Sequence, residues 1–129
     1  MPLKANLQVM VVDDMTVSRA LIEQALDWAG ITKVQYEANG EKALNRLVAS
    51  PVHLVISDYN MPGMDGLELL EALRANRSTQ RIGFILITGT ASKELIERGR
   101  KAGMNNFIAK PFTKEALLHC IEAVTGKLQ

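Results

Sequence analysis

The sequence predicts an α/β fold, a five-stranded parallel sheet with helices on both of its faces. Five short apolar segments alternate along the chain with longer segments whose apolar residues have helical spacing. The connections are short, and parallel strands joined through helices form right-handed crossovers that cover both faces of a sheet. The length of 129 residues suits a single domain that buries a sizeable core.

The predicted strands differ in how continuously apolar they are. Three of them are apolar almost throughout, which is typical of central parallel strands covered on both faces; they are residues 7–12, 53–57 and 83–87. The second strand along the chain, Lys33–Glu37, alternates between polar and apolar residues and is expected at an edge. The last strand is predicted over residues 106–109.

The first two predicted helices have recognisable ends. The first extends over residues 16–29, and Gly30 is suited to stop it in a left-handed cap. Trp28, late in this helix, is expected to pack against the sheet. The second helix follows Asn39 and ends before Pro51, because proline cannot continue a helix.

The third and fourth predicted helices are also bounded by residues that favour helix ends. The third opens at Asp65, and Glu68 follows three residues later, as in a capping box. The fourth covers residues 92–102 and stops at Gly103. Both helices therefore have a start or a stop signal in the sequence itself.

The fifth predicted helix begins near Thr113, stops at Gly126 and carries the one cysteine of the chain. A single cysteine excludes an intramolecular disulfide bond and is typical of a reducing compartment. We expect this cysteine to be a small buried apolar side chain. It belongs to the apolar face of the helix, which consists of Leu117, Cys120, Ile121 and Val124.

Charge and hydropathy exclude several classes of protein. The formal net charge is +1, so nothing indicates binding to nucleic acid. The N-terminal residues lack the apolar core of a signal peptide, and no apolar run is long enough to span a membrane. We therefore expect a cytoplasmic protein. Little sequence follows the last predicted helix, so residues 1–129 are expected to form a single domain with no fused output domain.

Polar residues follow four of the predicted strands at their carboxyl ends. In an open α/β sheet, ligands bind outside that edge, near the point where the strand order reverses. The side chains that we expect to meet there are Asp13, Asp14, Asp58, Thr88 and Lys110.

This set of side chains suits one kind of chemistry. Crowded carboxylates repel one another, and a hard divalent cation or a bound proton relieves the repulsion. Magnesium prefers oxygen ligands and usually takes only a few carboxylates, with water and phosphate oxygens completing its shell. A lysine and a threonine hydroxyl can bind the oxygens of a phosphoryl group. The set therefore predicts Mg²⁺-dependent phosphoryl transfer to a carboxylate, which gives an aspartyl phosphate.

Each of these residues also has an ordinary structural explanation when it is taken alone. Adjacent aspartates after a strand often cap a helix, and an aspartate before Pro62 and Gly63 can form a turn. A threonine at a strand end commonly bonds nearby backbone, and a lysine before a proline is often just exposed. Their joint occurrence at successive strand ends is what favours a functional site.

Four stretches of the sequence resemble the receiver domain of response regulators, in the right order and on the right elements. The resemblance covers essentially the full length and is closest to single-domain members such as the chemotaxis regulators. It implies a flavodoxin-like (βα)5 fold with the strand order 2-1-3-4-5. The matching stretches are residues 9–14, 54–66, 85–89 and 107–112.

The resemblance also implies roles for the acidic residues. Asp58 is expected to be the phosphoacceptor and a ligand of the magnesium ion. Asp14 is expected to bind Mg²⁺ directly and Asp13 largely through water, while the main-chain carbonyl of Asn60 completes the protein ligands. Apart from its own phosphorylation and dephosphorylation at Asp58, the protein is not expected to be an enzyme.

The same resemblance implies a conformational switch. Thr88 and Lys110 are expected to bind phosphoryl oxygens, and the Lys110–Pro111 peptide bond is expected to be cis. In the resembling proteins the threonine moves inward on phosphorylation, and an aromatic residue on the fifth strand fills the space that it leaves. That aromatic corresponds to Phe107, which lacks the hydroxyl of a tyrosine. Phe107 is therefore either the switch residue or a plain core aromatic.

Two roles within this family stay open. In the first, the protein is expected to accept a phosphoryl group from a sensor histidine kinase and then to bind a downstream protein such as the flagellar motor switch, in chemotaxis or motility. Alternatively, it is a phosphorelay intermediate that passes the group to a histidine phosphotransfer protein.

Two other classes of protein remain as rivals. A haloacid-dehalogenase-like phosphatase also forms an aspartyl phosphate, but it carries Asp-x-Asp after the first strand, where this chain has Asp13 and Asp14 adjacent. A flavodoxin-like cofactor binder needs a loop rich in Ser, Thr and Gly at that place, and residues 13–16 do not supply one.

Overall fold

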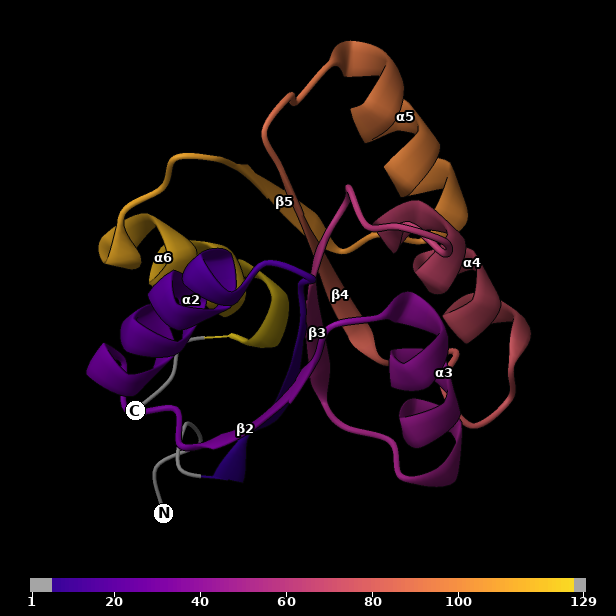
Figure 1. Cartoon of the computed structure of the whole chain (residues 1–129), viewed down its shortest axis with the longest axis horizontal. Helices are drawn as coiled ribbons and strands as arrows, with labels where there is room; N and C mark the ends of the chain where they lie inside the picture. Colours follow the sequence, from indigo (N-terminus) through magenta and orange to yellow (C-terminus); the bar gives the residue numbers. More distant parts are fainter. Residues whose placement is uncertain (1–5, 127–129) are drawn as a thin grey trace.

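A computed structural model describes residues 6–126 of the protein. Its five parallel strands lie in the order β2-β1-β3-β4-β5 (Figure 1), which confirms the predicted order and the edge position of the second strand. The strands are β1 (Gln8–Val12), β2 (Lys33–Glu37), β3 (Leu54–Asp58), β4 (Gly83–Thr88) and β5 (Asn106–Ala109). The helices are α2 (Thr16–Trp28), α3 (Gly40–Ala49), α4 (Gly66–Ala75), α5 (Lys93–Ala102) and α6 (Lys114–Thr125).

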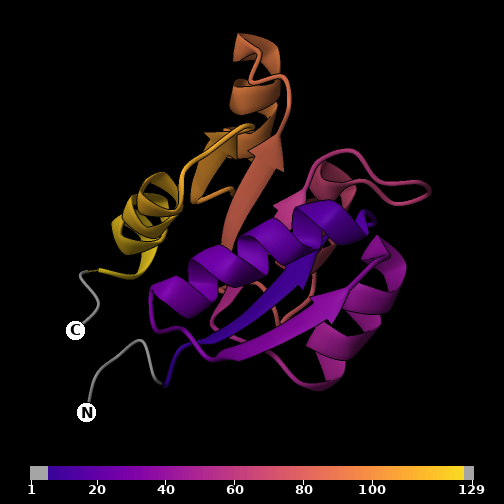
Figure 2. The same cartoon turned by 60° about the vertical axis from the view of Figure 1, so that its left-hand side comes forward.

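The helices form a layer on each side of the sheet. Helices α2 and α6 cover one face, and α3, α4 and α5 cover the other (Figures 1 and 2). Successive residues of β1 point to opposite faces, so Val9 and Val11 belong to the α2–α6 core while Met10 and Val12 belong to the other core. Among the described residues, no helix is long and apolar enough to cross a membrane.

The predicted helix ends are present in the structure. The amide of Glu68 donates to Asp65 Oδ1 at 2.8 Å, and the amide of Asp65 donates to Glu68 Oε1 at 3.0 Å, which completes the capping box. Gly30 and Gly103 have φ angles of 84° and 99°, the left-handed conformation expected after a helix. Cys120 is buried, as its place on the apolar face predicts, and this burial raises the pKa of its thiol to about 11.

The expectation for Trp28 is wrong. Its side chain is 47% exposed and does not pack against the sheet. Instead, Lys114 Nζ lies 4.9 Å from the centre of its ring, a cation–π contact between α2 and the start of α6.

The strand register brings the functional residues to one edge of the sheet. Asp58 is the last residue of β3 and pairs with Ile87, one residue before the end of β4. Thr88 ends β4 and pairs with Ala109, directly before Lys110. The carboxyl ends of the central strands therefore meet at the expected edge.

Gly66, the first residue of α4, allows this helix to approach the end of β3. A β-carbon at this position would collide with the main-chain oxygen of Asp58 and lie 3.0 Å from Leu86 Cδ1. The amide of Gly66 also donates to the carbonyl of Tyr59 at 2.9 Å. The backbone around Asp58 is thus held by a contact that only glycine permits.

We predict that Gly66→Ala lowers the free energy of unfolding by about 1–3 kcal/mol, the usual cost of overpacking. Chemical denaturation measures this change. Gly89→Ala is the matched control, because a β-carbon there meets nothing within 4 Å. Equal stabilities of the two variants would contradict the close approach of α4 to β3.

Candidate functional site

Three carboxylates form one cluster at the carboxyl edge of the sheet. Asp13 and Asp14 follow β1, and Asp58 ends β3, the neighbouring strand. One carboxylate oxygen of each lies within 4.8 Å of the others. Asp13 is fully buried and Asp58 is 5% exposed, while Asp14 faces solvent. Two carboxyl groups are therefore held close together away from water.

Asp13 is fixed by hydrogen bonds on three of its groups. Its amide donates to the carbonyl of Glu37 at 3.0 Å, and its Oδ1 accepts from the amide of Met15 at 2.9 Å. Its carbonyl accepts from a guanidinium nitrogen of Arg19 at 2.8 Å. Nothing in the sequence pattern marks Arg19, because this contact depends on how α2 folds back over the strand end.

The remaining oxygen of Asp13 lacks a hydrogen-bond partner. Among the side chains of residues 6–126, Asp13 Oδ2 is the one buried nitrogen or oxygen atom without such a partner. Buried polar atoms are usually satisfied, and leaving one unpaired is costly. An additional cation or a water molecule bound to it would remove this cost.

Lys110 supplies the single ammonium group of the cluster. Its Nζ lies 3.4 Å from Asp58 Oδ1 and 3.9 Å from Asp13 Oδ2. Its amide donates to the carbonyl of Thr88 at 2.9 Å, and its bond to Pro111 is cis. One ammonium group therefore pairs with two of the three carboxylates.

The environment of Asp58 favours its neutral form. Burial raises the pKa of this carboxyl above its ordinary value, and this effect outweighs the opposing attraction to Lys110. The charge on Asp13 raises the pKa of Asp58 further. Ionisation of Asp58 is thus less favourable in the folded protein than in the unfolded chain.

Thr88 is present at the site, but its hydroxyl is engaged elsewhere. The side chain is buried, and its Oγ1 donates to the carbonyl of Thr90 and accepts from the amide of Thr90, both at 3.1 Å. Between them lies Gly89, where a β-carbon would meet nothing within 4 Å. The hydroxyl holds the loop that follows β4 and does not bond to Asp58.

The two other residues of the expected site are Phe107 and Asn60. Phe107 is half-buried on β5, pairs with Leu86 and packs against the core beneath α3, α4 and α5. This partial burial is compatible with either role foreseen for it. Asn60 lies two residues beyond Asp58, in the loop after β3, and its side chain is exposed.

The donor set fits a magnesium ion. Carboxylate oxygens from two strand ends lie close together, and Asp13 Oδ2 is available for a ligand or for the water of a hydrated ion. Hard divalent cations prefer such oxygen ligands, and Mg²⁺ usually keeps several waters. The chemistry of the cluster therefore agrees with the expectation from the sequence.

Comparison with known proteins agrees with this description. A family model described as response regulator receiver domain matches residues 9–122. A probable chemotaxis protein CheY from Rhizobium etli is 40% identical over 129 residues, which is the whole of both chains.

Solved structures are similar as well. That of the chemotaxis protein CheY4 from Vibrio cholerae has a TM-score of 0.85 and 30% identity, and covers 92% of this chain and 98% of its own. The receiver domain of sensor histidine kinase PA1611 from Pseudomonas aeruginosa has a TM-score of 0.84 and 26% identity, covering 94% and 98%. That structure has a magnesium ion coordinated in its active-site cleft.

The crowding of carboxylates predicts that Asp58→Asn stabilises the protein. The folded-state pKa of Asp58 is raised above its ordinary value of 3.8, so the ionised form lowers stability as the pH rises through the folded-state pKa. At pH 7 without Mg²⁺, we expect the variant to gain about 1 kcal/mol in the free energy of unfolding.

Denaturation of both proteins between acid and neutral pH measures the effect. The difference should shrink as the pH falls through the raised folded-state pKa toward 3.8, and it should be lost below 3.8, where Asp58 is protonated in either state. Asp27→Asn, at an exposed position of α2, is the control and should change little. A loss of stability in Asp58→Asn at pH 7 would contradict the claim that the ionised carboxylate destabilises the folded protein.

Proposed function

This chain belongs to the response regulator receiver domain family, and on that premise we propose that it is a phosphorylation-dependent switch of a two-component system. The phosphoryl group would come from a sensor histidine kinase, and its acceptor would be Asp58. The observation that carries the proposal is the position of Asp58, buried at the end of β3 between Asp13 and Lys110. Receiver domains bind Mg²⁺ at such an acidic site.

The transfer itself needs few groups. An oxygen of Asp58 attacks the phosphorus atom, an O–P bond forms, and the bond from phosphorus to the donor nitrogen breaks. The imidazole leaves with the electron pair and takes a proton from solvent. Lys110 is within reach of the new phosphoryl oxygens because its Nζ already lies 3.4 Å from Asp58 Oδ1.

A bound Mg²⁺ would offset the negative charge of the donor phosphate and of the carboxylates during this transfer. Asp14, Asp58 and the carbonyl of Asn60 are the proposed direct ligands, with Asp13 acting through water. Asp13 Oδ2 is buried without a hydrogen-bond partner, which supports a role for Asp13 in binding a water molecule of the hydrated ion.

Thr88 and Phe107 would convert phosphorylation into a change of surface. The phosphoryl group adds about −1.5 to −2 charges, which attract the Thr88 hydroxyl as a hydrogen-bond donor. To turn toward these charges, the hydroxyl must give up its two hydrogen bonds to Thr90, which lies in the loop that leads into α5. Phe107 is half-buried and can move into the space that Thr88 vacates.

We propose that the phosphorylated protein binds a downstream protein in chemotaxis or motility, such as the flagellar motor switch. We also propose that it acts in the cytoplasm. The full-length similarity to a probable chemotaxis protein CheY supports this role, and it supports a single domain. The alternative is a phosphorelay intermediate, and transfer of label from the phosphorylated protein to a histidine phosphotransfer protein separates the two. Family membership disfavours both a haloacid-dehalogenase-like phosphatase and a flavin binder.

Incubation with Mg²⁺ and acetyl phosphate tests the proposal. We expect mass spectrometry to find one phosphoryl group, located on Asp58. The adduct should be absent in Asp58→Asn and after chelation of the metal, but present in Asp27→Asn. A phosphoryl group on Asp13 or Asp14, or none with several small donors, would contradict the assignment.

A further inference from the structure

Two arginine side chains line a pocket at the edge of the sheet where the strands begin, opposite to the acidic site. The pocket has a volume of about 490 Å³ and lies between the loop before β3 and the loop before β4. Arg77 and Arg81 are both exposed and belong to the second of these loops. The five residues of β3, from Leu54 to Asp58, separate the pocket from the acidic site by roughly 16 Å.

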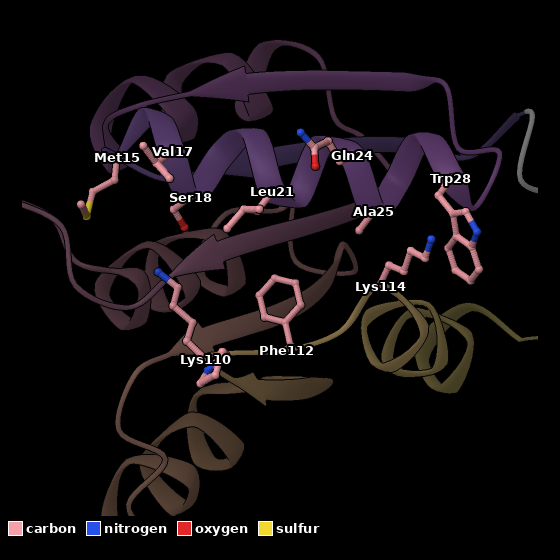
Figure 3. A pocket seen from close by; sticks show the side chains of 11 residues that line it. Met15, Val17, Ser18, Leu21, Gln24, Ala25, Trp28, Lys110, Phe112 and Lys114 are labelled. Atoms are coloured by element: carbon pink, nitrogen blue, oxygen red, sulfur yellow. The ribbon is translucent and has the colours of Figure 1, made fainter.

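A larger groove of the molecule adjoins the acidic site instead. It has a volume of about 730 Å³ and lies between α2 and the segment from β5 to α6 (Figure 3). Lys110 lines this groove and also lies 3.4 Å from Asp58 Oδ1. Among the described residues, the groove and the pocket share no lining side chain. Phosphoryl transfer to Asp58 therefore gives no reason for the two arginines of the pocket.

The two arginines have no partner in the described part of the chain. Neither guanidinium group forms a hydrogen bond or an ion pair with residues 6–126. By contrast, Arg46 pairs with Glu37 at 2.7 Å, and Arg74 donates to three different oxygen atoms. Guanidinium groups bind phosphate through paired hydrogen bonds, so two unpaired ones in one concave site are available to an anion from solution.

His53 adds a hydrogen-bond donor to the same pocket. Its Nδ1 accepts from the amide of Gln8 at 2.9 Å, which holds the ring in place. A ring nitrogen that accepts a hydrogen bond carries no proton, so the proton of this imidazole is on Nε2. Because His53 lines the pocket, Nε2 can donate to an oxygen atom of a ligand bound there.

Hydrogen bonds also hold the loop that carries the arginines. The hydroxyl of the buried Thr79 donates to the carbonyl of Leu73 at 2.7 Å, and the amide of Ile82 donates to the carbonyl of Thr79 at 3.1 Å. Arg74 donates to the carbonyl of Gln80 at 3.1 Å. The backbone of the loop is therefore ordered before a ligand arrives, which lowers the entropic cost of binding.

We propose that this pocket binds a small organic phosphate of the size of a nucleoside monophosphate. A phosphate monoester carries about −1.5 to −2 charges at neutral pH, which the two guanidinium groups balance. The ligand binds as an intact anion, and no bond is made or broken. Because the pocket and Asp58 lie at opposite edges of the sheet, both sites can be occupied at once.

The volume and the lining of the pocket favour an organic phosphate over a bare phosphate ion. Four oxygen atoms, each with the volume of a water molecule of about 30 Å³, fill roughly a quarter of the 490 Å³. The buried side chains of Val52 and Ile82 line the pocket together with Pro51 and offer apolar surface to an organic body. Sites for small molecules commonly combine an apolar lining with a few polar groups in this way.

Nucleic acid is a poorer candidate for the occupant than a small phosphate. The formal net charge of the chain is only +1, so the protein lacks the broad positive field that attracts a polyanion. The cations of the pocket are two arginines within one short loop. A single phosphate group with a compact body matches this limited charge.

Calorimetric titration of the full-length protein with adenosine 5′-monophosphate (AMP) tests the proposal, in low-salt buffer with EDTA. Guanosine 5′-monophosphate and ribose 5-phosphate are titrated as well, because the lining does not select one base. We expect AMP to bind with a Kd tighter than about 1 mM. Inorganic phosphate and adenosine should each bind at least about tenfold more weakly, since each supplies only half of the contacts. Asp58→Asn should match the wild type, so the test does not depend on phosphorylation of Asp58.

Substitutions define the pocket. Arg77→Gln and Arg81→Gln should each weaken AMP binding at least about tenfold, because each removes a charged hydrogen-bond donor. Arg98→Gln, at an exposed position of α5, is the matched control and should change the affinity less than about twofold. Far-UV circular dichroism and thermal unfolding check that the variants fold.

His53→Asn separates the ligand contact from the structural one. The Oδ1 atom of asparagine can take the place of Nδ1 and keep the bond to the amide of Gln8, whereas the donor at Nε2 is lost. We expect this variant to keep its thermal stability and to bind AMP about three- to tenfold more weakly.

The amide NMR spectrum locates the bound ligand. AMP should shift the amide signals of His53 and of residues 76–83, and leave those of Asp58 and Lys110 unchanged. Three results would overturn the proposal: no binding of any of the three organic phosphates, shifts centred on Asp58 and Lys110, or equal weakening by Arg98→Gln and the two pocket variants. Inorganic phosphate and sulfate that bind as tightly as AMP would also overturn it, because the pocket would then hold an adventitious ion only.

Discussion

The repulsion between Asp13 and Asp58 is the constraint on which the rest of the site depends. Their carboxylate oxygens lie within 4.8 Å, and at an effective dielectric constant of about 20 two such charges repel by roughly 3 kcal/mol. Lys110 contacts both but carries one charge, and Asp14 adds a third negative charge nearby. A further cation or a proton is needed to balance the cluster, which is the property expected of a site that binds Mg²⁺ and a phosphoryl group.

The fold tolerates this repulsion because the strands that carry it are firmly packed. Nearly all residues of β1, β3 and β4 are buried, and helices cover both faces of the sheet. The hydrogen bonds to Asp13 and the close approach of Gly66 to Asp58 hold the two carboxylates in place. A site fixed in this way has its ligands ready before the ion and the phosphodonor arrive.

Much of this arrangement follows from the sequence, since apolar runs mark the buried strands and their ends place the acidic residues at one edge. Contacts between distant segments do not follow from it. The Arg19 contact with the carbonyl of Asp13 is one example, and the fit of Gly66 is another. Trp28 is exposed because it lies two residues, about 200° of helix rotation, beyond the buried Leu26; its apolar character alone predicted the opposite.

Calorimetric titration with Mg²⁺ tests the central claim most directly. The account predicts one binding site in the wild-type protein, with an affinity that falls as the pH is lowered through the raised pKa of Asp58. Asp58→Asn should bind at least about tenfold more weakly, while Asp27→Asn should match the wild type. Absence of binding, or equal affinity in Asp58→Asn, would contradict the claim that these crowded carboxylates form a magnesium site.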